Sequence, residues 1–237
     1  MQPVFVRIAS LLIGAALASS AGVPALAASV GVGVDYYTGP SGLSVRDILA
    51  YGETSFGRAA RTTLTAVASR YSSSQTGPGT GAALAAGVPL SPQTSLQILG
   101  SRSFGDHGFR ASRFQLGPVF PIGAGRTLGI SYTRAYDSVG PSTKGIVMEA
   151  VIPATASFIA LARGALASVD GGGTNLQGSA GALWSPASHL ILLGEVTLGR
   201  DATGLPGGGI AITGPGSSSQ QYVSGPALLI GLRYVIH

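Results

Sequence analysis

The side chains best suited to acid–base or metal chemistry in this 237-residue chain are its three histidines, His107, His189 and His237. The strand map derived below separates them, into a loop at one end of the strands, a turn at the other end and the C-terminus. A metal site needs three or four converging ligands, so the three histidines cannot share one. The chain has no cysteine, which excludes disulfides and thiolate chemistry. We therefore predict neither a metal nor a cofactor.

His107 offers one further option. It follows Asp106 and lies close in sequence to Ser101, Ser103 and Ser112, and a histidine can activate a serine for attack on an ester. Serines are abundant in this chain, so nearness in sequence does not define a nucleophile. Hydrolysis of a lipid acyl ester near the outer leaflet is kept as the alternative to a chain without catalytic residues.

Seven charged residues fall where the expected strands point inward. Charges inside a membrane protein pair with one another or line water, so their mixed sign favours ion pairs that brace the wall. The alternatives are a charged constriction that selects passing solutes and acid–base catalysis by Glu149 or Glu195. These candidate lumen charges are Asp35, Glu53, Arg113, Glu149, Arg163, Glu195 and Arg233.

Four cations form a third candidate set, because they lie near the same end of four consecutive expected strands: Arg102, Arg110, Arg134 and Lys144. Arginine binds phosphate through two parallel hydrogen bonds. We call these four residues the arc, and they predict contact with lipopolysaccharide phosphates at the outer leaflet. Ordinary solvation of boundary charges is the alternative.

Prolines at nearly constant spacing indicate the elements that position these residues. Pro89, Pro121, Pro153 and Pro186 are separated by 32, 32 and 33 residues (89 to 121, 121 to 153, 153 to 186). A membrane-crossing strand needs roughly 9–11 residues, so two strands with a tight turn and a looser loop take about 30 residues. We place each proline in a short turn between hairpin strands.

The resulting fold class is all-β: a membrane-spanning antiparallel up-and-down β-barrel of about twelve strands, with ten as the alternative. An even number brings both termini to the periplasmic side. The short proline turns fall on that side and the longer connections outside, the longest at 200–220. The expected strands are 29–38, 45–56, 60–71, 80–89, 93–103, 109–120, 126–136, 143–152, 156–167, 174–185, 188–199 and 221–236.

Alternation along these strands predicts which side chains face lipid. In 126–136, for example, Ile130 and Tyr132 share one face and Ser131 and Thr133 the other. Aromatic residues near the strand ends predict two interfacial belts. The outer belt is Tyr36, Tyr37, Tyr71, Phe104, Phe109, Tyr136 and Tyr222, and the periplasmic belt is Phe56, Phe120, Phe158, Trp184 and Tyr234. The small inward residues, such as Gly31, Gly33, Gly129 and Gly181, favour a narrow wet lumen.

Composition and the N-terminus agree with export. Arg7 precedes an apolar run, and the triplet 25–27 (Ala-Leu-Ala) is typical of a signal-peptide cleavage site. We predict a signal peptide at 1–27 and a barrel domain at 28–237. Only 10% of residues are charged and the mean hydropathy is +0.40, which suits a surface facing lipid rather than water. The net charge is +5, but the basic residues form no dense run and the chain is expected to be exported, so we exclude nucleic acid as a partner.

The expected signal, short strands, proline turns and final strand, 228–236 (LLIGLRYVI), resemble small bacterial outer-membrane barrels. The arrangement is most similar to the YaiO-type barrel domain, across residues 29–237, although the chain ends on Ile236 and His237 rather than on an aromatic residue. The resemblance implies a non-catalytic outer-membrane protein with a structural envelope role, or one that passes small solutes or exports an envelope polymer. Expected partners are outer-membrane lipid, lipopolysaccharide, the barrel-assembly machinery and envelope or polysaccharide-export proteins.

Overall fold

The computed structural model describes residues 27–39, 42, 44–56, 62–74, 77–138, 142–170, 172–200 and 225–236. Residues 1–26 of the predicted signal peptide, Tyr222 and nearly all of the predicted loop at 200–220 lie outside these residues, whereas Ala27, the last residue of the predicted signal peptide, begins the first strand. Among the described residues, no helix is long and apolar enough to cross a membrane.

Twelve strands make up the described part of the chain, so the predicted number is confirmed and the ten-strand alternative is wrong. A short 3-10 turn, η3 (Asp106–Gly108), lies between β5 and β6. The strands are β1 (Ala27–Thr38), β2 (Ser44–Phe56), β3 (Thr62–Ser73), β4 (Gly77–Ser91), β5 (Thr94–Gly105), β6 (Arg110–Gly123), β7 (Arg126–Asp137), β8 (Thr143–Thr155), β9 (Phe158–Val169), β10 (Gly172–Ala187), β11 (Leu190–Arg200) and β12 (Gly225–Ile236).

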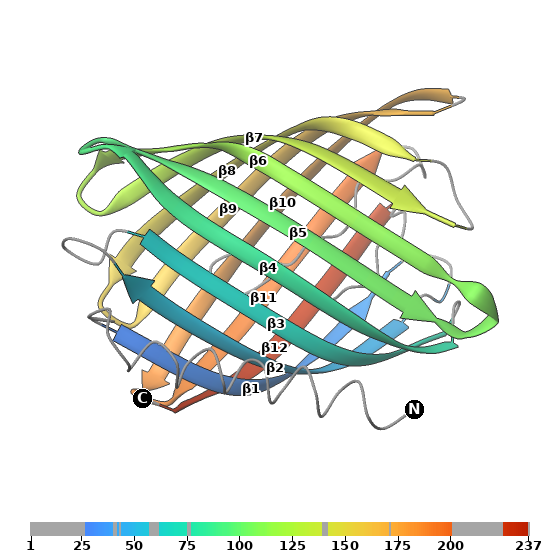
Figure 1. Cartoon of the computed structure of the whole chain (residues 1–237), viewed down its shortest axis with the longest axis horizontal. Coiled ribbons are helices and arrows are strands. Elements are labelled where there is room, and N and C mark those ends of the chain that lie inside the picture. The colour runs from blue at the N-terminus through green and yellow to red at the C-terminus, as the bar shows by residue number, and fades with distance from the viewer. Residues whose placement is uncertain are drawn as a thin grey trace.

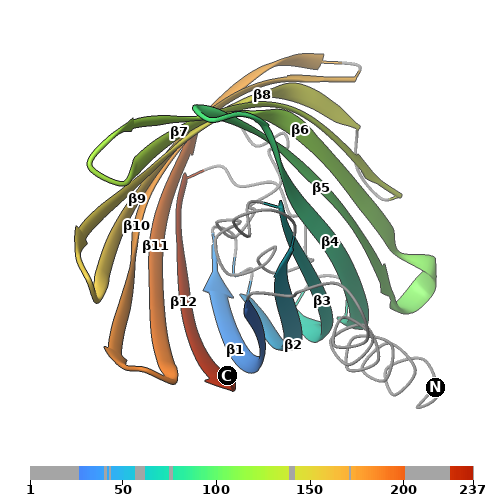
Figure 2. The same ribbon diagram turned by 60° about the vertical axis from the view of Figure 1, so that its left-hand side comes forward.

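The strands form one closed barrel in which each strand pairs antiparallel with its neighbours in sequence. All strands are tilted, so those of the near wall cross those of the far wall (Figure 1), and closure of a sheet into a barrel requires such a tilt relative to the barrel axis. β12 returns to pair with β1, from Val30 opposite Ile236 to Thr38 opposite Leu228. Figure 2 shows this seam between β1 and β12. Closure leaves no unpaired strand edge, which is the condition for a β-structure to span a bilayer.

The repeated prolines lie inside strand ends rather than in the turns, which corrects the sequence-based prediction. Pro89, Pro121 and Pro153 each stand two residues before the end of their strand, and Pro186 stands one residue before. The pairing register shifts at each of these places. Proline has no N–H to donate to a ladder, so within sheets it is confined to edges and bulges. The repeat therefore marks a bulge next to each tight turn.

Four hairpins close through two-residue turns at one end, which we call the turn end. At the other, the loop end, most connections are longer, although two residues, 170–171, also join β9 and β10. Pro92-Gln93 and Ala124-Gly125 are two of the four turns described. β1 begins and β12 finishes at the turn end, as expected for an even-stranded barrel. Short turns mark the periplasmic side in outer-membrane barrels, so the loop end corresponds to the outside.

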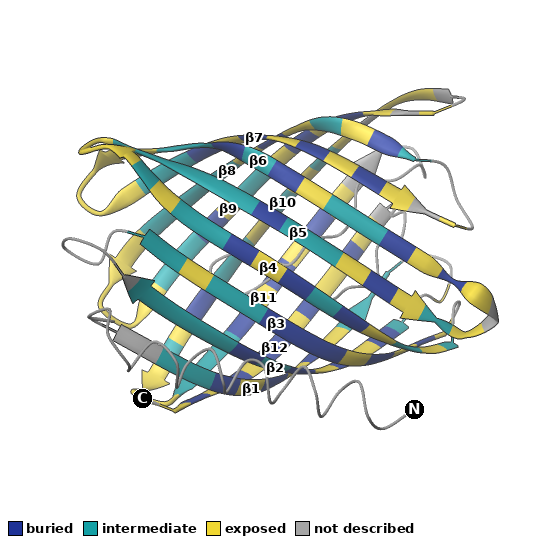
Figure 3. Cartoon of the chain, viewed as in Figure 1, coloured by how far each residue is buried: buried dark blue, intermediate teal, exposed yellow. Residues whose placement is uncertain are grey.

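The exterior of the wall is apolar. Large hydrophobic side chains are exposed at alternate positions of most strands, and they include Ile130, Tyr132, Leu176, Leu198 and Ile236. Figure 3 shows buried and exposed residues alternating along the strands. The predicted face is confirmed in β7, where the buried Ser131 and Thr133 alternate with the exposed Ile130 and Tyr132. Such a surface is stable against lipid and not against water.

The interior holds more apolar side chains than predicted. Tyr37, Tyr71 and Phe109, expected in the outer aromatic belt, instead pack inside the barrel with Val45 and Ala111. A second interior cluster contains Leu161, Leu183, Leu193 and Leu229, and a third contains Leu49, Tyr51, Val67 and Val235. By contrast, Tyr36, Phe104, Phe120, Phe158, Trp184 and Tyr234 face outward as predicted.

At two inward glycines a neighbouring ring fills the space that the missing side chain leaves. Gly31 lies opposite Tyr51, and Gly79 lies opposite Tyr71. A Cβ placed at either glycine would overlap the tyrosine ring of its partner. Each glycine therefore makes room for a large neighbour that lies flat against the wall.

Candidate functional site

The seam between the first and last strands carries a buried ion pair inside the barrel. The guanidinium of Arg233 forms a two-pronged contact with the carboxylate of Asp35, in which Nη2 donates to Oδ2 at 2.7 Å and Nη1 donates to Oδ1. The side chains are 2% and 1% exposed. A charge buried this deeply is tolerated only when it is paired with good geometry.

Two glycines on the opposing strands accommodate this pair. Asp35 stands directly across from Gly231, and Arg233 stands directly across from Gly33. A Cβ at Gly33 would meet the Arg233 side chain, and one at Gly231 would overlap the Asp35 carboxylate. The pattern Gly-x-Asp in β1 and Gly-x-Arg in β12 thus interlocks across the seam.

Asp47 belongs to the same region, and the sequence analysis did not single it out. It is 1% exposed and stands directly opposite Asp35 on β2. The inward positions of β2 also include Val45, Leu49 and Tyr51. Because apolar residues occupy both faces of this strand, alternation does not reveal which face Asp47 shares. Its one signal is the two-residue spacing from Val45 and Leu49.

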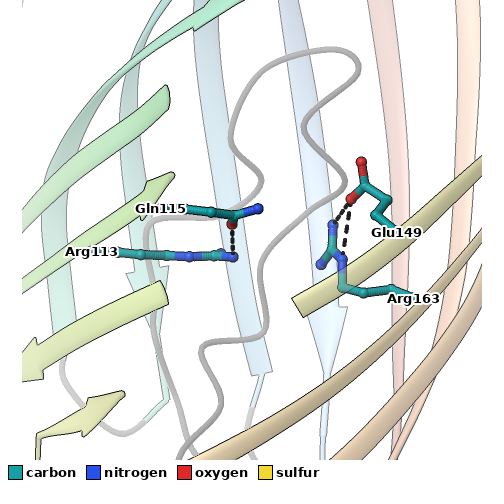
Figure 4. A network of polar contacts seen from close by, with 4 residues as sticks. All are labelled: Arg113, Gln115, Glu149 and Arg163. Carbon is teal, nitrogen blue, oxygen red and sulfur yellow. Dashed lines mark hydrogen bonds and ion pairs between the residues drawn. The ribbon is translucent and has the colours of Figure 1, made fainter. Parts of the chain in front are cut away.

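A second group of charges meets near the middle of the interior (Figure 4). Arg163 on β9 lies directly opposite Glu149 on β8, and its Nη2 and Nε donate to Oε2 of Glu149 at 2.9 and 3.3 Å. From the other side of the interior, Arg113 Nη2 on β6 donates to Oε1 of Gln115 at 2.6 Å.

Glu195 on β11 completes this central group. It is 4% exposed, accepts a hydrogen bond from Ser179, and lies within electrostatic range of Arg113, Glu149 and Arg163. The central group therefore contains two guanidiniums and two carboxylates and has no net charge. Opposite charges on facing walls cross-link the barrel wall and also present polar groups to anything that enters.

Glu53 is the remaining predicted lumen charge. It lies on an inward position of β2 toward the turn end, is partly buried, and forms no hydrogen bond or ion pair within the described residues. Counting inward side chains that the structure describes in the strands gives five carboxylates and three guanidiniums, a net charge of −2. The five are Asp35, Asp47, Glu53, Glu149 and Glu195; the three are Arg113, Arg163 and Arg233.

The four cations of the arc all stand exposed on the outside of the wall, toward the loop end: Arg102, Arg110, Arg134 and Lys144. Arg134 is directly opposite Lys144 on the neighbouring strand. The structure thus places the four on neighbouring strands β5 to β8.

The histidines do not form a site within the described residues. No group of three or more His, Cys, Asp or Glu side chains there could hold a metal ion. His189 lies in the turn between β10 and β11, where Nδ1 contacts the carbonyl of Val235 at 3.1 Å. The His107 side chain lies outside what the structure describes, so a pairing with Ser101, Ser103 or Ser112 stays a hypothesis.

Solved structures share this fold, whereas no family model and no curated protein matches the sequence. A KdgM porin in complex with disordered oligogalacturonate gives a TM-score of 0.60 at 10% identity, covering 88% of this chain and 99% of that chain. A second KdgM porin structure gives 0.58 at 10% identity, covering 87% and 99%. The NanC porin gives 0.53 at 9% identity, covering 86% and 98%.

These similarities, with the closed wall and its apolar exterior, define the class: the chain is an outer-membrane β-barrel with a porin-like fold. A closed antiparallel barrel with short turns at one end is the architecture of proteins in the bacterial outer membrane, and that is where this protein belongs.

Proposed function

We propose that this barrel is a non-catalytic outer-membrane protein that passes small solutes, or strands of an envelope polymer, through its interior. The observation that carries the proposal is the central group of Arg113, Glu149, Arg163 and Glu195, which puts polar groups inside a wall that is apolar outside. A structural role in the envelope is the remaining possibility if the interior does not conduct.

The interior charges narrow the class of solute. Arg163 and Arg233 are each held by a carboxylate of the wall, and Arg113 is held by Gln115. Glu53, by contrast, has no partner within the described residues. Because carboxylates exceed guanidiniums among the described inward side chains, the interior suits uncharged or cationic solutes. An acidic oligosaccharide such as the oligogalacturonate named for one structural neighbour would meet no surplus of positive charge.

Two finer relationships belong to this proposal. The final strand and the proline spacing support kinship with YaiO-type barrels. Such a barrel requires the barrel-assembly machinery for insertion into the membrane. As an exporter it would also contact envelope or polysaccharide-export proteins.

Conductance across a planar bilayer tests the proposal. Purified protein should give small, stable current steps, and a potassium chloride gradient should give a reversal potential with the sign of cation preference. Gly129→Trp should lower the conductance, because Gly129 faces inward and a Cβ there meets only ordinary contacts at 3.6 Å or more.

Gly164→Trp is the matched control, since Gly164 faces outward with open space around it. A folded wild-type barrel that carries no current would overturn the passage function and leave the structural role. Gly181, which we also expected to be a small lumen position, is unsuitable as a block, because a Cβ there would lie 2.6 Å from the Gly194 carbonyl oxygen.

A further inference from the structure

Charges are divided between the two faces of the barrel wall. None of the outward strand positions whose side chains the structure describes carries a carboxylate, whereas those positions carry six cations toward the loop end. They are Arg46, Arg70, Arg102, Arg110, Arg134 and Lys144. The outward positions of β9, β10 and β12 that are described carry no cation. The positive charge is therefore concentrated on one side of the barrel.

The arc of Arg102, Arg110, Arg134 and Lys144 is the densest part of this charge. Arg134 stands directly across from Lys144, and Phe114 lies on its other side. Neighbouring strands lie about 4.8 Å apart, so the four cations on β5 to β8 spread over about 15 Å across the sheet. Along the strands, Arg110 stands four residues nearer the loop end than Phe114, the partner of Arg134. None of them forms an ion pair within the described residues.

This arrangement is unfavourable for the protein alone. Like charges directly opposite on adjacent strands destabilise a sheet, and a cation on the lipid-facing side of a barrel costs free energy that rises with depth. Arg134 and Lys144 incur both costs at once. An anion bound between them would offset both.

Exposed aromatic residues mark the level of the arc in the membrane. Tyr132 and Tyr136 flank Arg134 on the same face of β7 and are 46% and 52% exposed. The guanidinium of Arg102 lies over the Phe104 ring, 4.9 Å from its centre. Aromatic girdles sit at the membrane–water interface, which is where lipid headgroups carry their phosphates.

We propose that the arc is a binding site for the phosphate groups of a phosphorylated glycolipid of the outer leaflet. The guanidiniums of Arg102, Arg110 and Arg134 and the ammonium of Lys144 bind the phosphates, while the apolar exterior below them receives the acyl chains. Arginine matches phosphate oxygens with its planar fork, and lysine adds a point charge. A lipid is the occupant because the arc is continuous with the lipid-facing exterior of β5 to β8.

Lipid retention by a variant tests the site. The change of Arg102, Arg110, Arg134 and Lys144 to Gln removes all four charges and keeps hydrogen-bonding side chains. Each near-surface cation contributes about a fivefold change in attraction to anionic lipid, so phosphorylated glycolipid that co-purifies at low salt should fall at least about tenfold. Each single change should lower retention by no more than about fivefold.

Arg126→Gln is the matched control, because Arg126 is an exposed cation at the opposite, turn end of β7. It should leave retention unchanged. Folding of every variant is checked by the heat-dependent change in gel migration that a closed barrel gives. The proposed site would be overturned if the folded quadruple variant retained as much glycolipid as wild type. It would also be overturned if the variant lost a co-purified protein while keeping its lipid.

A second measurement uses the wild-type protein, so it stands even if the quadruple variant does not fold. Delipidated protein in a neutral detergent is titrated with lipid A carrying both phosphates and with the same lipid A after enzymatic dephosphorylation. The phosphorylated form should bind at least tenfold more tightly, and inorganic phosphate at millimolar concentration should not displace it. Equal binding of the two forms would overturn the proposal, and full displacement by inorganic phosphate would show a free-anion site instead.

Discussion

At the scale of single residues, the seam ion pair links the first and last strands of the sequence. Asp35 and Arg233 are both almost fully buried, and each lies against a glycine of the strand that carries its partner. Closure of a barrel requires the two chain ends to find each other in one register. A buried charge that is satisfied in a single register favours that register over a slip by two residues.

Removal of one partner should destabilise the barrel more than removal of both. Asp35→Val leaves Arg233 as a buried unpaired charge, a loss that costs about 3–5 kcal/mol. In the double variant Asp35→Val/Arg233→Leu, most of this free energy of unfolding should return, because neither member of the seam pair is left buried without the other. Urea unfolding followed by fluorescence of Trp184, the one tryptophan in the chain, measures both. A double variant less stable than either single variant would contradict this account.

The glycines of the seam yield a second residue-scale prediction. Gly33→Ala should destabilise the barrel, because the new Cβ would overlap the Arg233 side chain. Gly164→Ala makes the same chemical change in a strand but meets nothing within 4 Å, and alanine there should be neutral or slightly stabilising. The difference between their urea midpoints isolates the overlap. Equal midpoints would show that the ion pair can shift at no cost.

Inward residues were predictable from the sequence only where the outward face is uniformly apolar. The face of Glu195 follows from its alternation with Val196 and Leu198. The direction of Tyr37 and Tyr71 does not follow, because a tyrosine near a strand end fits either an interfacial belt or an interior. Tyr71 turns inward because Gly79 across from it leaves room for its ring, and that pairing depends on the register of β3 against β4.

At the scale of elements, the hairpins repeat because each pairs a proline bulge with a two-residue turn. The bulge ends regular pairing, and the turn reverses the chain. The 32-residue spacing was readable from the sequence. The placement of each proline one or two residues before the strand end was not, since proline is equally frequent in turns.

The turn between β6 and β7 contains a strained residue. Ala124 has φ +48° and is the one non-glycine residue with positive φ among those described. Ala124→Asn should raise stability by about 1 kcal/mol, because asparagine tolerates this conformation and Asn-Gly is the favoured pair in such turns.

The control for this turn is Ala156→Asn in the turn between β8 and β9, where the backbone has no positive φ. That variant should gain nothing. Urea midpoints of the two variants against wild type measure the difference. A gain in Ala156→Asn as large as in Ala124→Asn would attribute the effect to the asparagine side chain rather than to the turn conformation.

At the scale of the whole molecule, fold class and strand number followed from composition and spacing alone, because a bilayer fixes strand length. The distribution of charge did not follow, since it needs the register of all twelve strands. Among the described strand side chains, every carboxylate faces inward together with three guanidiniums, and the outward cations near the loop end gather on one side. The proposed lipid site depends on which end of the barrel faces outward.

Cysteines introduced at the two ends of β9 test this orientation, and the native chain has none to interfere. Asp170 follows β9 at the loop end, and Ala156 precedes it at the turn end; both are exposed. Asp170→Cys should react with an impermeant thiol reagent on intact cells, because Asp170 lies at the loop end, where most connections are longer, and the longer connections of outer-membrane barrels lie outside. Ala156→Cys should react only after the outer membrane is permeabilised, and the unmodified chain provides the background. If Ala156→Cys alone were labelled on intact cells, the orientation of the barrel would be the reverse of the one assigned. The arc would then lie at the periplasmic leaflet, away from the glycolipid proposed to bind it.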